Sequence, residues 1–413
     1  MIGSYNRWTL VVILAGGKGE RLGPLTQVRC KPAVPFGGIY RIIDMTLSNC
    51  INSGLRRIFV FTQYVPASLN RHLREGWRFI SRPTIGEFVE SLAPQHRAGE
   101  ESFRGTADAL YQNLTTIEQE DAEVVLVLSG DHIYKMDYRP MLDFHVQTGA
   151  DMTIGAVEVS KSQASGLGIF EVDTGSRVVG FQEKPNDPKT VPGHPDICLA
   201  SMGIYAFRIS ALRKALEASA SDPESTHDIG RDIVWRMMRG GPVMAYQFVD
   251  MNKKASKYWR DVGTIDAYWS ANMDLVAIDP EFNLYDRNWP IYTAQVVAPP
   301  PKFIFSQEGP DGRVGTATDS VIAPGTIISG GRVHSSVVGP FCRINSYAQI
   351  QESILFDNVD VGRRAVIRRA IIDKDVRIPE GTKIGVNPEE DRKRFYVSPG
   401  GIVVIAKGDV ILP

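Results

Sequence analysis

The sequence has few cysteines, no long apolar run near its start and almost no net charge. The four cysteines, Cys30, Cys50, Cys198 and Cys342, show no CxxC spacing, which argues against a zinc cluster or a disulfide framework and predicts reduced thiols in a cytoplasmic protein. The apolar run over residues 10–15 is far too short to span a bilayer. Because of this short run we expect no membrane partner. The 46 basic and 47 acidic residues give a net charge of −1, and with no long basic run we expect no nucleic-acid partner.

The composition and pattern predict two domains joined by a linker. With 413 residues, 43% of them hydrophobic, the chain is long and apolar enough for more than one core. Over residues 1–285, short β-branched runs alternate with helix-patterned stretches, which predicts an α/β domain with a mainly parallel sheet. Its expected strands are Leu10–Leu14, Ile58–Thr62, Val124–Leu128, Met152–Val157, Gly203–Phe207 and Val243–Phe248, and its helical stretches include Ser68–Trp77 and Ala107–Glu118. Residues 286–315 lose this pattern and contain three consecutive prolines, which is typical of a stiff linker.

A repeat fills residues 316–413. A small residue followed by two apolar ones recurs at intervals of 16, 17 and 17 residues, starting at Ser320, Ser336, Ser353 and Ala370. Short strands at so constant a spacing cannot bury a face alone, so they are expected to stack into a parallel β-solenoid. An antiparallel β-sandwich is the alternative, which we disfavour because sandwich strands need not keep a constant repeat.

A glycine-rich turn, Gly16–Leu22, follows the first expected strand. Glycines put no Cβ between the backbone amides and a polyphosphate, so the turn could cradle phosphates, although plain turns after strands are common. It is neither a P-loop nor a complete dinucleotide fingerprint. Two cations, Arg21 and Lys31, accompany the turn and are suited to neutralising a triphosphate.

Carboxylates follow other strands of the expected sheet. Asp131 would lie at the carboxyl edge of the sheet, where it could hold Mg²⁺ on phosphates, although a helix cap is an equal alternative. Glu183 beside Lys184 suits a phosphorylated sugar, or else an exposed turn. No Ser-His-Asp or Cys-His set stands out. This fits a reaction in which a sugar phosphate attacks a nucleoside triphosphate and the enzyme mainly positions the reactants.

Taken together, the motifs resemble the ADP-glucose pyrophosphorylases, which are glucose-1-phosphate adenylyltransferases. The matching segments are Gly16–Leu22, Lys31–Gly38, Tyr40–Asp44, Gly105–Ala109, Gly130–Asp137, Ala200–Tyr205, Tyr258–Thr264 and Asn288–Thr293. This resemblance implies a Rossmann-like catalytic domain, a left-handed β-helix and a homotetramer. It also implies an activity that needs Mg²⁺ as cofactor. ATP and glucose 1-phosphate would be converted to ADP-glucose and pyrophosphate, the committed step of bacterial glycogen synthesis.

The resemblance also implies roles for individual residues. Arg21 and Lys31 would act on the ATP phosphates, and Asp131 and Asp261 would hold Mg²⁺, with Asp131 also counted as catalytic. Lys184 would bind the phosphate of glucose 1-phosphate. The sugar contacts would be Glu183 and Ser201, and the nucleotide contacts Ala15, Gly16, Gly17, Gln95, Gly105 and Thr106.

One departure concerns regulation. Many bacterial members resembling this chain carry a lysine after the Gly37-Gly38 pair that contributes to the site of an anionic glycolytic activator, whereas Ile39 stands here. An activator of this kind and a nucleotide inhibitor are still implied by the resemblance. The candidate anion contacts are Arg41, Arg392 and Arg394, and a solvated surface is the alternative for the last two.

Two alternatives share part of this pattern. A sugar nucleotidyltransferase that uses another base would have the same glycine turn and Asp131, although Lys31–Asp44 and Tyr258–Thr264 favour the adenylyl family. A regulatory subunit with little chemistry would tend to lose the arginine of the turn or the following lysine. Both Arg21 and Lys31 are present, which favours an enzyme.

Overall fold

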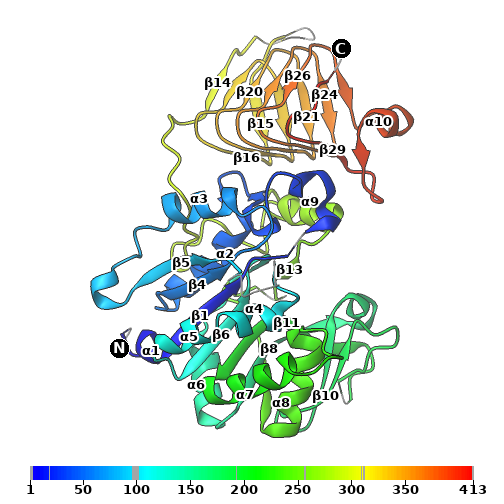
Figure 1. Cartoon of the computed structure of the whole chain (residues 1–413). Helices are drawn as coiled ribbons and strands as arrows, with labels where there is room; N and C mark the ends of the chain where they lie inside the picture. Colours follow the sequence, from blue (N-terminus) through cyan, green and yellow to red (C-terminus); the bar gives the residue numbers. More distant parts are fainter. Residues whose placement is uncertain are drawn as a thin grey trace.

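The computed structural model describes residues 3–17, 19–94, 102–191, 193–254, 257–307, 309 and 312–411. An α/β part is followed by a solenoid (Figure 1). Of the expected site residues, Gln95 lies outside the described residues. Within the described ranges, no helix combines the length and the apolar character needed to cross a membrane.

A nine-stranded sheet forms the centre of the α/β part. Seven of its strands run in one direction and β10 and β11 run in the other, which confirms the mainly parallel sheet. Six expected strands all lie on observed ones. The strands are β1 (Thr9–Leu14), β4 (Arg57–Phe61), β5 (Phe88–Leu92), β6 (Val124–Ser129), β8 (Met152–Ser160), β9 (Gly168–Val172), β10 (Val178–Glu183), β11 (Ile197–Arg208) and β12 (Val243–Gln247).

Helices cover both faces of this sheet, so its central strands are apolar throughout. On β1, Leu10 and Val12 pack into one core while Val11 and Ile13 pack into the other, and all four are fully buried. The face of Val11 is covered by α2 (Ile42–Asn52), α3 (Ala67–Gly76) and α6 (Arg139–Gln147). The opposite face is covered by α4 (Thr106–Gln112), α5 (Leu114–Gln119), α7 (Ile209–Ala220) and α8 (Val234–Gly240).

The helical stretch expected over Ala107–Glu118 is divided into two helices. Asn113 separates α4 from α5, and its side-chain amide donates to the carbonyl of Ala109. Asparagine side chains compete with the backbone for such hydrogen bonds, so the helix is interrupted at Asn113. The apolar period of the sequence continues through this break and does not reveal it.

The solenoid has three parallel sheets, as the repeat predicts. Within each sheet successive coils pair in parallel, which excludes the β-sandwich. The added strand β28 pairs antiparallel with β29. The first sheet contains β14 (Lys302–Ile304), β17 (Ile327–Ser329), β20 (Arg343–Ile344), β23 (Asp360–Val361) and β26 (Arg377–Ile378). The second contains β15 (Thr316–Thr318), β18 (Arg332–His334), β21 (Gln349–Gln351), β24 (Val366–Arg368) and β27 (Lys383–Ile384). The third contains β16 (Val321–Ile322), β19 (Val337–Val338), β22 (Ile354–Leu355), β25 (Ala370–Ile372), β29 (Val403–Ile405) and β28 (Tyr396–Val397).

The four copies of the repeat occupy equivalent positions in the third sheet, on β16, β19, β22 and β25. The first solenoid strand, β14, lies inside the segment 286–315 that was expected to be a linker, and it pairs with β17. The sequence Lys302–Ile304 lacks the small-apolar-apolar signature of the repeat, so the period does not reveal this strand.

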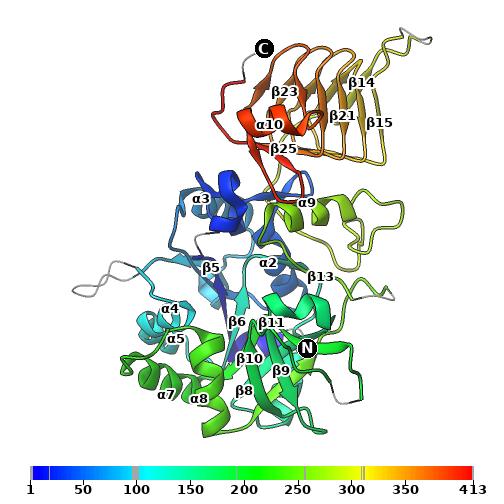
Figure 2. The same cartoon turned by 90° about the vertical axis from the view of Figure 1, so that its right-hand side faces the viewer.

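The two parts of the chain are packed against each other through a shared core and buried polar contacts. Helix α9 (Ile265–Asp274) lies beneath the solenoid in both views (Figure 1, Figure 2). Arg29 forms two 2.9 Å hydrogen bonds with Asp373 of the solenoid, and both side chains are buried. The indole of Trp269 donates to the carbonyl of Glu352 at 2.8 Å. Through α9, the solenoid is therefore in contact with the segment that carries Asp261.

Candidate functional site

The candidate site begins where two neighbouring strands of the sheet end. Leu14, the last residue of β1, pairs with Ser129, the last residue of β6. The glycine turn and Asp131 consequently start at the same edge of the sheet, as parallel strands require. Gly130 fits closely there, because a Cβ on it would lie 3.0 Å from a methyl carbon of Ile13.

Lys31 lies between two carboxylates at this edge. It starts the short helix η2 (Lys31–Ala33), and its Nζ lies 2.8 Å from Oδ2 of Asp131 and 2.9 Å from Oδ1 of Asp261. Arg21, in η1 (Glu20–Thr26), is more exposed and places Nη2 3.8 Å from Oδ2 of Asp261. The structure thus brings together the four residues to which the family resemblance assigns the phosphates and the metal.

Pairing between two short strands carries Asp261 to this edge. Strand β13 (Trp259–Asp261) runs antiparallel to β7 (His132–Tyr134), with Asp261 opposite His132. After β13 the chain passes close to Arg21 at Gly263, where a Cβ would lie 2.7 Å from Nη2. A side chain at this position would displace the Arg21 guanidinium from Asp261.

The charges in this cluster stabilise one another. Burial raises the pKa of Asp131, but the charges of Lys31 and His132 and hydrogen bonds from Lys31 and Ser129 outweigh it, so this pKa lies well below its usual range. Burial lowers the pKa of Lys31, whereas Asp131 and Asp261 raise it, and the pKa ends above its ordinary value. At neutral pH Asp131 is therefore a carboxylate and Lys31 an ammonium, so Asp131 can serve as an anionic ligand.

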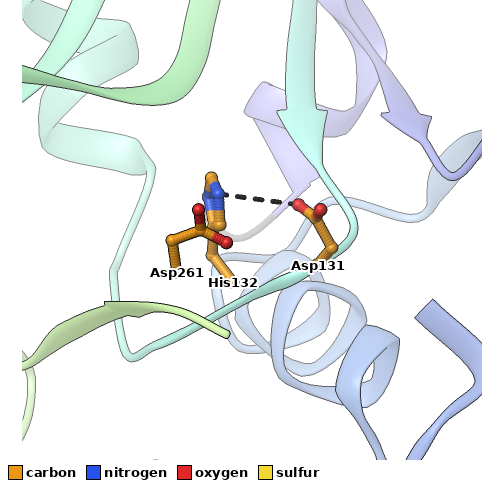
Figure 3. Close-up of side chains that lie close together, drawn as sticks. All are labelled: Asp131, His132 and Asp261. Atoms are coloured by element: carbon orange, nitrogen blue, oxygen red, sulfur yellow. Dashed lines mark ion pairs between the residues drawn. The ribbon is translucent and has the colours of Figure 1, made fainter. Parts of the chain in front are cut away.

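The same cluster has donors for a divalent cation. One ligand atom each from Asp131, His132 and Asp261 lies within 4.8 Å of the others (Figure 3). Carboxylate oxygens are the ligands that Mg²⁺ prefers. The residues present therefore fit a divalent ion bound on the protein side of a phosphate chain.

Two adjoining cavities of about 390 Å³ each open from this edge. The first is lined by glycines and by charged residues of both signs, including Gly17, Gly19, Arg21, Lys31, Asp131 and Gly263. The second is lined by more apolar groups and a helix start, including Gly16, Phe61, Gln63, Phe103, Gly105 and Thr106. Leu14, Gly17 and Asp131 line both. A charged ligand portion fits the first cavity and an aromatic one the second.

Gly105 and Thr106, two of the expected nucleotide contacts, also make structural contacts at the start of α4. A Cβ on Gly105 would lie 2.3 Å from the carbonyl oxygen of His227, so only glycine fits. The hydroxyl of Thr106 donates to Asp228 at 3.0 Å and accepts from the amide of Ile229 at 2.9 Å. Thr106 lines the second cavity while its hydroxyl holds the 227–229 loop.

The expected sugar-phosphate residues lie on β10 and β11. Glu183 ends β10, and Lys184 follows it with a positive φ of 49° and with Nζ 3.4 Å from Oε1 of Glu183. Ser201 lies on β11, with its Oγ 3.3 Å from the phenol oxygen of Tyr205. The pairing of β11 with β8 is irregular between Ser201 and Tyr205, which is typical of strands near sites.

Two further residues belong to this group and were not assigned from the sequence. Burial raises the pKa of Tyr205 to about 12; the Ser201 hydrogen bond opposes this, and the charges of Asp228 and Glu183 add to it. Tyr205 ends the Ala200–Tyr205 motif, so its position was visible but its role was not. Asp228 has no sequence signal, because it comes to the group only through the contact of its loop with Thr106.

The three candidate activator contacts are divided between two places. Arg41 is turned inward and donates to the carbonyl of Ala33 and to the Ser68 hydroxyl, both at 2.8 Å, and burial lowers its pKa. Arg392 and Arg394 end α10 (Pro388–Arg394) and line a cavity of about 450 Å³ between the solenoid and η1. Arg41 is not among the residues that line this cavity.

Two family models match the two parts of this chain. Residues 10–277 match the family model described as Nucleotidyl transferase, and residues 299–405 match the model described as GlmU-like, C-terminal hexapeptide. The hexapeptide match and the three parallel sheets are consistent with a left-handed β-helix.

Relatives match this chain over almost its full length. The chain is 52% identical to the glucose-1-phosphate adenylyltransferase of Rhodopirellula baltica, with 98% of this chain and 91% of the relative covered. It is 51% identical to the protein of that name from Koribacter versatilis, with 97% and 95% covered. It is 49% identical to glucose-1-phosphate adenylyltransferase 2 of Vibrio cholerae, with 96% and 97% covered. The chain therefore belongs to the glucose-1-phosphate adenylyltransferase family of nucleotidyl transferases.

Proposed function

We propose that this protein transfers the adenylyl group of ATP to glucose 1-phosphate, giving ADP-glucose and pyrophosphate for glycogen synthesis. The observation that carries the proposal is the contact of Lys31 with both Asp131 and Asp261, beside a glycine turn and two adjoining cavities. The names of the relatives support this pair of substrates.

In this reaction a phosphate oxygen of glucose 1-phosphate attacks the α-phosphorus of ATP. The new oxygen–phosphorus bond forms as the bond from the α-phosphorus to the bridging oxygen breaks, and pyrophosphate leaves with that electron pair. The protein has to position the two anions and screen their charge. Arg21 and Lys31 supply the positive charge, and Gly16 and Gly17 allow the backbone to approach the phosphates.

We assign the divalent ion that nucleotidyltransferases generally use to Asp131 and Asp261, and propose that it is Mg²⁺. When bound, the ion would neutralise and orient the triphosphate. The low pKa of Asp131 supports this role, because the carboxylate is ionised at every pH at which the enzyme would work.

For glucose 1-phosphate we propose that Lys184 binds the phosphate while Glu183 and Ser201 bind hydroxyls. Tyr205 and Asp228 extend this set. With a pKa of about 12, the phenol of Tyr205 stays protonated at neutral pH and can donate a hydrogen bond. Glu183 and Asp228 offer acceptors, as sugar hydroxyls require.

We also propose a cytoplasmic homotetramer regulated by an anionic glycolytic activator and a nucleotide inhibitor. The four cysteines are all buried and unpaired, which suits a reducing compartment. The cavity beside Arg392 and Arg394 and the inward-facing Arg41 both lie near contacts of the solenoid with the α/β part. Sedimentation and activation by sugar bisphosphates, hexose phosphates and pyruvate test these points.

Pyrophosphate release from glucose 1-phosphate tests the activity itself, with ATP, UTP, dTTP, GTP and CTP compared side by side. We expect turnover to favour ATP. Preference for another nucleotide would move the chain to a related sugar nucleotidyltransferase, and no turnover with any of them would favour a regulatory subunit.

A further inference from the structure

His132 follows Asp131 in the chain and lies beside both acidic residues of the site. It begins β7 directly opposite Asp261 of β13. Figure 3 shows its ring beside Asp261, with a ring nitrogen facing Asp131. Nothing in the proposed chemistry of phosphates and sugar uses this imidazole.

The hydrogen bonding of His132 determines which nitrogen carries a proton. Nδ1 lies 3.1 Å from the carbonyl oxygen of Met202. A carbonyl oxygen can only accept, so Nδ1 is the donor, and in the neutral ring Nε2 is left with a lone pair. Histidines that bind metals commonly donate one ring N–H to a carbonyl oxygen in this way and bind the metal through the second ring nitrogen.

That lone pair faces negative charge. Nε2 lies 3.5 Å from Oδ1 of Asp131, and this oxygen already accepts a hydrogen bond from Ser129. Nε2 and the Asp131 carboxylate therefore face the same space, together with Asp261. A divalent ion in that space could take the nitrogen as a ligand beside the two carboxylates.

The distances are close to those of a coordination shell. Ligands about 2.1 Å from one ion lie about 3 Å apart when adjacent and about 4.2 Å apart when opposite. The donor atoms of Asp131, His132 and Asp261 lie within 4.8 Å of one another, so a small inward shift would bring all three to one ion.

The ring of His132 is also held in this position. Trp259, two residues before Asp261, packs edge-on against it with the ring centroids 4.9 Å apart. With the Met202 carbonyl on one side and Trp259 on another, the imidazole has two independent contacts that fix its direction. Such fixed orientation is what metal-binding histidines need.

We propose that His132 is a third protein ligand of the catalytic cation, binding it through Nε2 beside Asp131 and Asp261. This rests on the proposed function for the presence of the ion. Because imidazole binds later first-row metals such as Co²⁺ far better than it binds Mg²⁺, His132 makes the site favour Co²⁺ over Mg²⁺. His132 is thereby a residue that determines metal selectivity.

Pulsed electron paramagnetic resonance of bound Mn²⁺ tests this directly, with and without α,β-methylene-ATP, an unreactive substrate analogue. We expect nitrogen modulation of the spin echo in the wild-type protein, changing to the ¹⁵N pattern when histidine is ¹⁵N-labelled. The modulation should disappear in His132→Gln and in His132→Phe, the latter keeping a ring against Trp259. His334→Gln, which changes an exposed solenoid histidine, is the matched control and should keep it.

Titration calorimetry of the same proteins measures the selectivity. We expect His132→Gln to weaken Co²⁺ binding by about 10-fold or more and Mg²⁺ binding by much less. Bound Mn²⁺ without nitrogen modulation in the wild-type protein, in either state, would overturn the proposal and indicate that His132 is a protonated partner of Asp131. The proposed activity would survive that result, because it is read separately from ADP-glucose formation.

Discussion

Nζ of Lys31 lies 2.8 Å from Oδ2 of Asp131, and only 7% of the lysine side chain is exposed. Removing such a pair from water costs free energy that its attraction only partly returns, so a buried ion pair is weak evidence for stability. Here the pair lies at the meeting point of two cavities and holds one carboxylate ionised. Its position therefore points to function.

Lys31→Met should reduce kcat by about 10²- to 10³-fold, because a positive charge aimed at the phosphates is lost in the transition state. Initial rates at saturating ATP and glucose 1-phosphate measure it, and circular dichroism checks the fold. Lys161→Met, which removes an exposed lysine paired with Asp187, is the control. A kcat within about threefold of wild type would remove Lys31 from the chemistry.

Lys184→Ala should mainly raise the KM for glucose 1-phosphate. A charge-assisted contact is worth about 1.5–3 kcal/mol, which corresponds to roughly 10- to 150-fold. The KM for ATP should change little, since Lys184 does not line either cavity of the glycine turn. An unchanged KM for the sugar phosphate would assign its phosphate to another cation.

Asp373→Asn should destabilise the contact of the two parts, because it leaves the buried Arg29 without its counter-charge. We expect a loss of about 3–5 kcal/mol, measured by denaturant unfolding. Glu380→Gln, which breaks the exposed 2.9 Å pair with Arg364, should cost at most about 1 kcal/mol. Equal effects of the two substitutions would show that burial of the Arg29 pair has no energetic consequence.

Folding stability should fall as the pH is lowered below about 6.5, in part because of His145. Burial lowers the pKa of this histidine to about 4, and its Nδ1 lies 2.9 Å from the hydroxyl of Thr153. Between its unfolded pKa of about 6.5 and its folded pKa, the unfolded chain binds a proton that the folded chain does not. The native state is therefore favoured above this window and loses that advantage as the pH falls through it.

From pH 7 to pH 5 this effect amounts to about 2 kcal/mol. Denaturant titrations at both pH values should show it, and His145→Asn should remove it because asparagine does not titrate. If the wild-type protein and His145→Asn lose the same free energy over this interval, the histidine is not the group responsible.

The elements with strong local periods could be predicted from the sequence. The apolar run at Leu10–Leu14 becomes β1, and the four copies of the repeat become equivalent strands of one solenoid sheet. The direction of β11 could not be predicted, because periodicity shows that a strand exists and not which neighbour it pairs with. The break at Asn113 was hidden for a similar reason, since the apolar period continues through it.

In the site, too, residues in local motifs could be predicted from the sequence, whereas residues positioned by distant contacts could not. Arg21, Lys31 and Asp131 follow motifs that can be read locally, and the structure brings them together with Asp261. The approach of Asp261 depends on pairing between two three-residue strands, for which the sequence has no periodic signal. His132, Tyr205 and Asp228 were missed because their importance lies in contacts with distant segments.

Adenylyl transfer is assigned here to the cluster of Lys31, Asp131 and Asp261. The most direct measurement is chromatographic quantification of ADP-glucose and pyrophosphate formed from ATP and glucose 1-phosphate with Mg²⁺, by the wild-type protein and by Asp131→Asn. We predict the two products in a one-to-one ratio, with a rate about 10³-fold lower in the folded variant. Absence of ADP-glucose from the wild-type reaction would contradict the proposed activity, and undiminished formation by Asp131→Asn would contradict the assignment of this carboxylate to the site.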